Sequence, residues 1–128
     1  MAIRSRVVTL HRDAQVPADQ TAIVLGAVVL PKTGKIKSVK GWIFAKTGDN
    51  AAQLDVLKSG AAGSSGAAST TSVLSAVMDM TSDAIVTGTL SATLSAIHFI
   101  AGEVLYLKAT TGGTTTMDRI TVTIEVDY

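Results

Sequence analysis

The stretch Arg119-Ile120-Thr121-Val122-Thr123-Ile124-Glu125-Val126-Asp127 decides the fold, because apolar and polar residues alternate along it. A period of two places its isoleucines and valines on one face of an extended chain and its threonines and Glu125 on the other. β-branched side chains are stiff at the first torsion and pack well on a pleated surface. This stretch therefore predicts a β-strand with one buried face.

A second strand is predicted shortly before it, over Glu103–Thr110. By the same period, Leu105 and Leu107 take the core-facing positions of this strand. Glycines before and after the segment indicate turns, because glycine accepts backbone angles that other residues avoid. The connection Gly112–Thr116 either closes a hairpin onto the final strand or crosses between two sheets.

Similar runs predict further strands over Ile3–Leu10, Ala22–Leu30, Ile36–Ala45, Gln53–Leu57 and Thr87–Leu94. The apolar residues of Val73–Met80 fit both a helical and an alternating spacing, and the strand-rich surroundings favour a strand. Leu94–Ile100 has the pattern of a short helical turn. Seven or eight strands with turns between them, and no alternation of strands with helices, predict an all-β fold. The expected architecture is an antiparallel β-sandwich that is jelly-roll-like.

The composition predicts one domain whose surface faces other proteins. A chain of 128 residues is long enough for a single core, and 47% of its residues are hydrophobic. Charged residues make up only 16%, against about 25% in a typical soluble domain. Threonine and serine together supply 28 residues. We expect such a surface, poor in charge and rich in hydroxyl groups, to contact neighbouring subunits.

The residue types that are missing exclude several classes of protein. The chain has no cysteine, which excludes disulfides, thiolate metal sites and a cysteine nucleophile and favours assembly in a reducing cytoplasm. The segment before His11–Asp13 lacks the apolar run of a signal peptide. The longest uncharged apolar run, Thr21–Pro31, is too short to cross a bilayer, so no membrane partner is expected.

The sequence contains no recognisable motif for catalysis, a cofactor or a metal. Its two histidines, His11 and His98, lie far apart and show no ligand spacing. Lys32–Lys35 lacks the first glycine and the hydroxyl residue that a phosphate loop requires. No serine lies in a Gly-x-Ser-x-Gly motif. We therefore expect a protein that is not an enzyme, with no catalytic, cofactor-binding or metal-binding residues.

Positive charge is concentrated in the first half of the chain. Residues 1–64 carry nine Lys/Arg and four Asp/Glu, whereas residues 65–128 carry two and six. The basic residues are spread out with Trp42 as their single aromatic neighbour, whereas nucleic-acid surfaces usually combine dense basic residues with stacking aromatics. We expect no direct contact with nucleic acid. The asymmetry favours complementary charge between neighbouring copies or toward an acidic protein shell.

From about residue 36 onward, the order of features resembles the jelly-roll modules of tailed-bacteriophage virion proteins. The motifs that carry this resemblance are Val-x-Lys-x-Gly at 56–60, Ala-Gly-Glu-x-Leu at 101–105, Thr-Gly-Gly at 111–113 and the alternating strand at 120–126. They are strand and turn patterns rather than catalytic signatures. The resemblance covers about three quarters of the chain, and the Gly/Ala/Ser-rich stretch 60–69 departs from the family pattern.

The resemblance implies a structural role in a phage particle. Family members include capsid decoration (cement) proteins, head fibres and modules of tail or receptor-binding appendages. The expected function is that of a decoration protein, which binds the major capsid protein on the outside of the capsid and stabilises the shell by clamping neighbouring subunits, as a homotrimer. The alternative is a receptor- or glycan-binding domain of a tail or head appendage. The protein is expected on the capsid surface of the virion, after synthesis in the cytoplasm of the host bacterium.

The chain is expected to have two parts. Residues 1–20 form an N-terminal arm or strand, and residues 21–128 form the jelly-roll sandwich with a flexible loop at 60–69. If the N-terminal segment is an arm, it reaches the capsid or a neighbouring copy. If it is not, Ile3–Leu10 is the first strand of the core.

Four residues are the candidate contacts with the capsid or with another subunit. Arg4, Arg6 and Arg12 give the N-terminal segment its positive charge. Tyr128 follows the final strand directly, where an aromatic side chain is expected to be exposed or to lie in a subunit contact.

Overall fold

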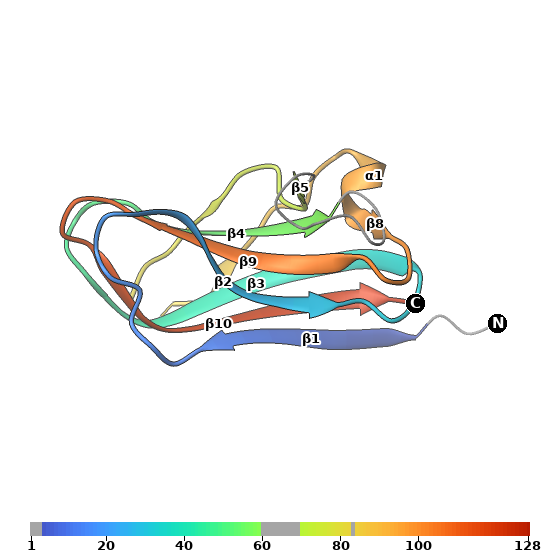
Figure 1. The fold of residues 1–128 in the computed structure, drawn as a ribbon, viewed down its shortest axis with the longest axis horizontal. Helices are drawn as coiled ribbons and strands as arrows, with labels where there is room; N and C mark the ends of the chain where they lie inside the picture. Colours follow the sequence, from blue (N-terminus) through green and yellow to red (C-terminus); the bar gives the residue numbers. More distant parts are fainter. Residues whose placement is uncertain (1–3, 60–69, 83) are drawn as a thin grey trace.

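Over the residues that the structure describes, the protein is a sandwich of two antiparallel β-sheets, each of five strands (Figure 1). The computed structural model describes residues 4–59, 70–82 and 84–128. This part of the chain contains ten strands and one short helix, α1 (Leu94–Ile97). The strands are β1 (Ser5–Arg12), β2 (Gln20–Val29), β3 (Gly34–Thr47), β4 (Ala52–Ser59), β5 (Thr70–Ser72), β6 (Met78–Asp79), β7 (Val86–Thr87), β8 (His98–Phe99), β9 (Val104–Thr111) and β10 (Thr116–Asp127).

Strands that are distant in sequence pair with each other. The first sheet has the order β1-β10-β3-β7, and β8 also pairs with β3. The second sheet has the order β2-β9-β4-β5, and β6 also pairs with β4. The chain thus pairs its first strand with its last, its second with its second to last and its third with its third to last. Further inward, β4 pairs with β5 and β6. This nested antiparallel pairing is the jelly-roll topology. The prediction of an all-β, jelly-roll-like sandwich is confirmed.

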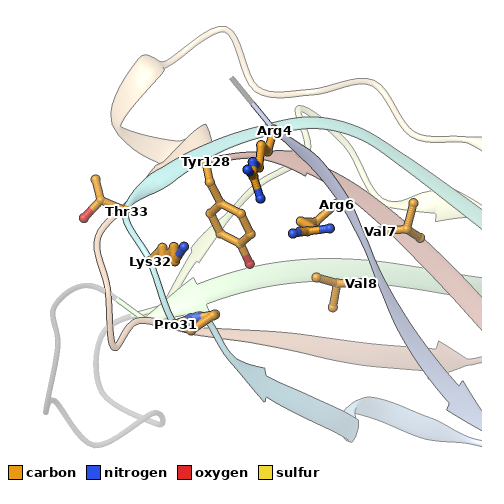
Figure 2. Close-up of a pocket in the computed structure, with 8 residues that line it drawn as sticks. All are labelled: Arg4, Arg6, Val7, Val8, Pro31, Lys32, Thr33 and Tyr128. Atoms are coloured by element: carbon orange, nitrogen blue, oxygen red, sulfur yellow. The ribbon is translucent and has the colours of Figure 1, made fainter. Parts of the chain in front are cut away.

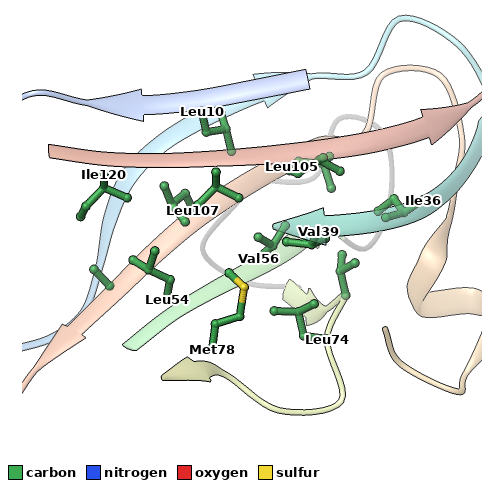
Figure 3. Packing of buried hydrophobic residues seen from close by; sticks show 14 of the residues in the cluster. Leu10, Ile36, Val39, Leu54, Val56, Leu74, Met78, Leu105, Leu107 and Ile120 are labelled. Carbon is green, nitrogen blue, oxygen red and sulfur yellow. The ribbon is translucent and has the colours of Figure 1, made fainter. Parts of the chain in front are cut away.

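The strictly alternating stretch occupies a central position in the first sheet. β10 runs between β1 and β3, and Ile124 lies opposite Val8 on one side and Val39 on the other. The fully buried residues of this stretch are Ile120, Val122, Ile124 and Val126. In β9, Leu105 and Leu107 are buried as predicted. The apolar faces of the two sheets form one core between them (Figure 3).

The strands between β4 and β9 are shorter than the sequence predicts. Of Val73–Met80, predicted as one strand, only Met78–Asp79 is a strand, and Leu74 makes an isolated bridge. Thr87–Leu94 is a strand only at its first residue, and α1 begins at its last. The helical turn predicted over Leu94–Ile100 is confirmed for Leu94–Ile97, whereas His98–Phe99 is a strand. Ten strands are described rather than seven or eight, because the partner of β4 is divided into β5 and β6 and the partner of β3 into β7 and β8.

The connection Gly112–Thr116 crosses from β9 in the second sheet to β10 in the first, which decides between the two predicted alternatives. Gly113 has a φ of 52°, and a Cβ there would lie 2.5 Å from the side-chain oxygen of Asn50. Only glycine takes this left-handed conformation without strain and leaves room for Asn50. The left-handed backbone and the close approach of Asn50 therefore explain the second glycine of the Thr-Gly-Gly motif.

The described part of the N-terminal segment is a strand at the edge of the first sheet. β1 pairs with β10 over its whole length without a shift in register. Leu10 is buried, and Val16, after the strand, is fully buried. Residues 1–20 were predicted to form either an arm or a strand, and Ser5–Arg12 forms a strand. The predicted flexible loop at 60–69 lies outside the described residues.

Candidate functional site

An open cleft of about 630 Å³ lies at one edge of the sandwich, between the start of β1 and the turn after β2. We call it the basic cleft. Its lining residues are Arg4, Arg6, Val7, Val8, Pro31, Lys32, Thr33 and Tyr128. Figure 2 shows the guanidinium group of Arg6 and the hydroxyl end of Tyr128 directed toward the same space. Segments from both ends of the sequence therefore build this cleft together.

The strand register brings Arg4 and Tyr128 side by side. The backbone N–H of Tyr128 donates a hydrogen bond to the carbonyl group of Arg4 at 3.0 Å, which extends the β1–β10 ladder by one pair. The Tyr128 ring stands edge-to-face on Phe99, with centroids 6.1 Å apart and planes at 90°. Because Phe99 is buried, this contact holds the Tyr128 ring against the core and leaves its hydroxyl at the cleft.

Gly34 allows the end of β10 to lie close to the start of β3, next to the cleft. A Cβ at Gly34 would collide with the carbonyl oxygen of Asp127 and would lie 2.9 Å from Cζ of Phe99. A residue without a side chain is therefore required at this position, because both neighbours belong to packed elements.

The basic cleft is positively charged. Arg4, Arg6 and Lys32 line it, and none of its lining residues is acidic. The neighbouring carboxylate of Asp127 lies 3.7 Å from the ammonium group of Lys37, so its charge already has a partner. Guanidinium groups present a fork of donors that matches carboxylates and phosphates. The arrangement is therefore suited to bind anionic groups.

Three of the four predicted contact residues meet in this cleft. Arg4, Arg6 and Tyr128 line it. Arg12 lies near the other end of β1, roughly 20 Å from Arg6 at the usual rise of a strand, and its Nε donates to a nearby backbone carbonyl group. Lys32 was not predicted, and it enters the cleft because the turn after β2 lies beside the start of β1.

A buried ion pair, which was not predicted either, joins β4 to the residue that precedes β9, its neighbour in the second sheet. Nζ of Lys58, near the end of β4, is 3.3 Å from Oε2 of Glu103, which precedes β9, and the two side chains are only 9% and 4% exposed. The Lys58 ammonium also donates to the carbonyl group of His98 at 2.6 Å. Oε1 of Glu103 accepts from the backbone N–H of Ile100 at 3.0 Å. The pair joins the Val-x-Lys-x-Gly and Ala-Gly-Glu-x-Leu motifs in space.

The side chain of His11 lies on the open surface. Its Nδ1 is 2.8 Å from Oγ1 of Thr121, and its Nε2 is 2.7 Å from Oδ1 of Asp13. This carboxylate partner was not predicted from the sequence. The His11 and Asp13 side chains are 48% and 86% exposed, so water has access to the whole chain of contacts. The contacts of His11 are therefore open to water, whereas electrostatic catalysis is strongest in a site from which water is excluded.

Within residues 4–59, 70–82 and 84–128, no three His, Cys, Asp or Glu side chains gather as metal ligands would. In the same part of the chain, no helix is long and apolar enough to cross a membrane.

A smaller cleft of about 340 Å³ lies on the outer face of the first sheet. Trp42 and Ile85 line it together with two threonines of β10, and Ile85 is 70% exposed. The ring of Phe44 lies beside that of Trp42, with centroids 6.2 Å apart, and the Arg119 guanidinium lies 5.2 Å from the Phe44 centroid. This face therefore presents aromatic and apolar groups to solvent.

Comparisons with known proteins agree with the fold. No protein-family model and no curated protein sequence matches this chain. Among solved structures, it is similar to a chain from the structure of infectious bursal disease virus, Gx strain, with a TM-score of 0.52 and 16% sequence identity. The match covers 97% of this chain and 32% of the viral chain, so this chain spans about a third of that protein's length. The likeness shows that this jelly-roll-like β-sandwich is an architecture that also occurs in a chain of a virus structure.

Proposed function

We propose that this chain is a structural protein of a virus particle, of the capsid decoration type of tailed bacteriophages. In this proposal it binds the outside of the capsid as a homotrimer and clamps neighbouring subunits of the major capsid protein. The observation that carries the proposal is the jelly-roll sandwich, shared over 97% of this chain with a chain of a virus structure. The motifs at 56–60, 101–105 and 111–113 support the phage type.

The proposed mechanism is mechanical. Each copy buries surface across a seam of the shell, so that the pressure of packed nucleic acid must break additional contacts to open it. A stable interface buries about 1,200–2,000 Å², and several contacts in one trimer multiply a modest affinity. The basic cleft supplies charge for such a contact, since Arg4, Arg6 and Lys32 stand there without an acidic lining residue. This role requires no catalytic residue.

Gold-labelled antibodies against this chain test the proposal on particles purified from infected cells that carry its gene. The expected result is dense labelling over the whole head of each particle. The purified protein is expected to sediment as three copies of the 13.1 kDa chain. Particles without label, together with a monomer that does not bind capsids, would refute the decoration role.

The aromatic face of the first sheet favours a second candidate, a receptor- or glycan-binding domain of an appendage. The cleft beside Trp42 and Ile85 presents a ring and an aliphatic side chain, the kind of surface on which sugar rings stack. The same labelling experiment separates the two candidates, because an appendage gives a few labels at one point of the particle. For an appendage, Trp42→Ala abolishes attachment to host cells. For a decoration protein, it leaves attachment unchanged.

A further inference from the structure

The outer edge of β1 has backbone groups that are free to pair with another strand. β1 is the terminal strand of the first sheet, and no strand pairs with its other side in the described part of the chain. The hydrogen bond from Tyr128 to the carbonyl group of Arg4 shows that Arg4 directs its backbone groups toward β10. In an antiparallel ladder this orientation alternates from residue to residue. Ser5, Val7 and Thr9 therefore direct their N–H and C=O groups away from β10, toward the open edge.

This edge is accessible and regular. The side chains of Ser5, Val7 and Thr9 are exposed, and Val7 is 67% exposed. The register between β1 and β10 contains no bulge that would twist the edge away. Natural sheets usually cover or distort an open edge of this kind, since it is a template for another strand.

The basic cleft lies on one face of the same edge. Arg4 and Arg6 are two residues apart, so their side chains leave the same face of β1 about 7 Å from each other. Lys32 and the hydroxyl of Tyr128 stand across the cleft from the strand. A strand added to this edge would repeat the same spacing, because its side chains also alternate between the two faces. Every second side chain of the added strand would then point toward the cationic groups.

We propose that the edge of β1 binds an extended acidic segment of another protein as an added strand. Its backbone pairs with Ser5, Val7 and Thr9. Aspartate or glutamate at every second position enters the basic cleft and meets Arg4 and Arg6. The identity of the partner as a capsid protein rests on the proposed function above, whereas the binding of an acidic strand is tested separately from it.

Charge argues against a second copy of this chain as the occupant. Pairing of β1 with β1 of another copy brings Arg4, Arg6 and Arg12 of both strands onto one face of the ribbon. The described residues of β1 include no aspartate or glutamate that would offset this repulsion. An acidic strand instead adds an opposite charge for each arginine.

The test uses the full chain and a short fluorescent peptide in which glutamate alternates with valine. Fluorescence anisotropy is expected to show binding that weakens as salt is added, because the contacts are between opposite charges. A peptide with glutamine in place of glutamate is expected to bind at least about tenfold more weakly. A peptide of the same composition with its glutamates grouped at one end is expected to lose most of the affinity, because alternation is what places them in the cleft.

Two test variants, each with a matched control, separate the contributions of the basic cleft and of the open strand edge. Arg4→Glu combined with Arg6→Glu is expected to weaken peptide binding at least about tenfold. Lys40→Glu combined with Lys46→Glu, both in β3, changes net charge equally outside the cleft and leaves binding near its original value. Val7→Pro removes one N–H at the open edge, where proline is tolerated, and is expected to abolish strand addition. Val7→Thr keeps the N–H and binds the peptide normally. Circular dichroism and thermal unfolding establish that each variant is folded.

Four outcomes would overturn the proposal. The first is equal binding of the acidic and glutamine peptides, and the second is unchanged binding by folded Val7→Pro. The third is loss of self-association in the Arg4→Glu/Arg6→Glu variant, which would make the cleft an interface between copies of this chain. Short single-stranded DNA is the competing anion, and displacement of the peptide by it at equal charge would also count against an acidic strand. Peptide binding without labelling of particles would leave this proposal standing and remove the capsid role alone.

Discussion

Replacing Glu103 with leucine is expected to lower the free energy of unfolding by about 3–5 kcal/mol. The change leaves the Lys58 ammonium without its counter-ion in a position where the side chain is only 9% exposed. It also removes the acceptor for the backbone N–H of Ile100, and an unpaired buried donor costs about 1–3 kcal/mol. Unfolding in urea, followed by circular dichroism, measures the loss.

A double variant identifies the cause of this loss. Lys58→Met combined with Glu103→Leu removes both charges, and it is expected to recover the part of the stability that the unpaired Lys58 charge costs, because apolar residues often replace a buried ion pair without cost. The cost of the unpaired Ile100 N–H remains in the double variant. Glu125→Gln, on the outer face of β10, is the control and is expected to change stability by less than about 0.5 kcal/mol. A Glu103→Leu protein as stable as the original would contradict the burial of this pair.

Ile124→Ala is expected to cost about 2–5 kcal/mol. Ile124 is fully buried in β10, which has strands on both sides, so the smaller side chain leaves a cavity that the neighbouring strands cannot close. The loss is expected as a lower midpoint in urea with an unchanged slope, because the unfolded chain exposes the same surface.

The adjacent residue supplies the matched control. Thr123 lies one position earlier in β10, opposite Thr9 and Lys40, and faces outward. Thr123→Ala is expected to cost less than about 1 kcal/mol, through the lower strand preference of alanine alone. Equal losses at Thr123 and Ile124 would contradict the assignment of one buried and one exposed face.

The long strands could be predicted because alternation over many positions fixes which face is buried. In β10 a slip of one residue would move every isoleucine and valine to the solvent side, so a single register is possible. The segments β5 to β8 could not be predicted in the same way. Each has only two or three residues, which is too short to show a period, and their positions depend on pairing with β3 and β4.

The buried ion pair could have been predicted from the same period. Lys58 continues the inward-facing positions of Leu54 and Val56 in β4. Glu103 stands two residues before Leu105, again on the inward face. Burial of these two residues was not predicted, and charged side chains are rarely buried without a partner. The contact between the two segments depends on the pairing of β4 with β9.

The basic cleft was predictable only in part. Arg4 and Arg6 were predicted as contacts because they give the N-terminal segment positive charge, and Tyr128 because it directly follows the final strand. Their contact follows from the pairing of the first strand with the last, which no local pattern shows. Lys32 joins them because the turn after β2, in the other sheet, lies beside the start of β1.

The most direct test of the central claim is an electron cryomicroscopy map of particles purified from infected cells that carry this gene. The account predicts density for the jelly-roll sandwich on the outer surface of the capsid, with the edge of β1 paired to an acidic segment of the shell. A map in which every position outside the capsid lacks this density, or in which the bound protein turns the edge of β1 toward solvent, would contradict it.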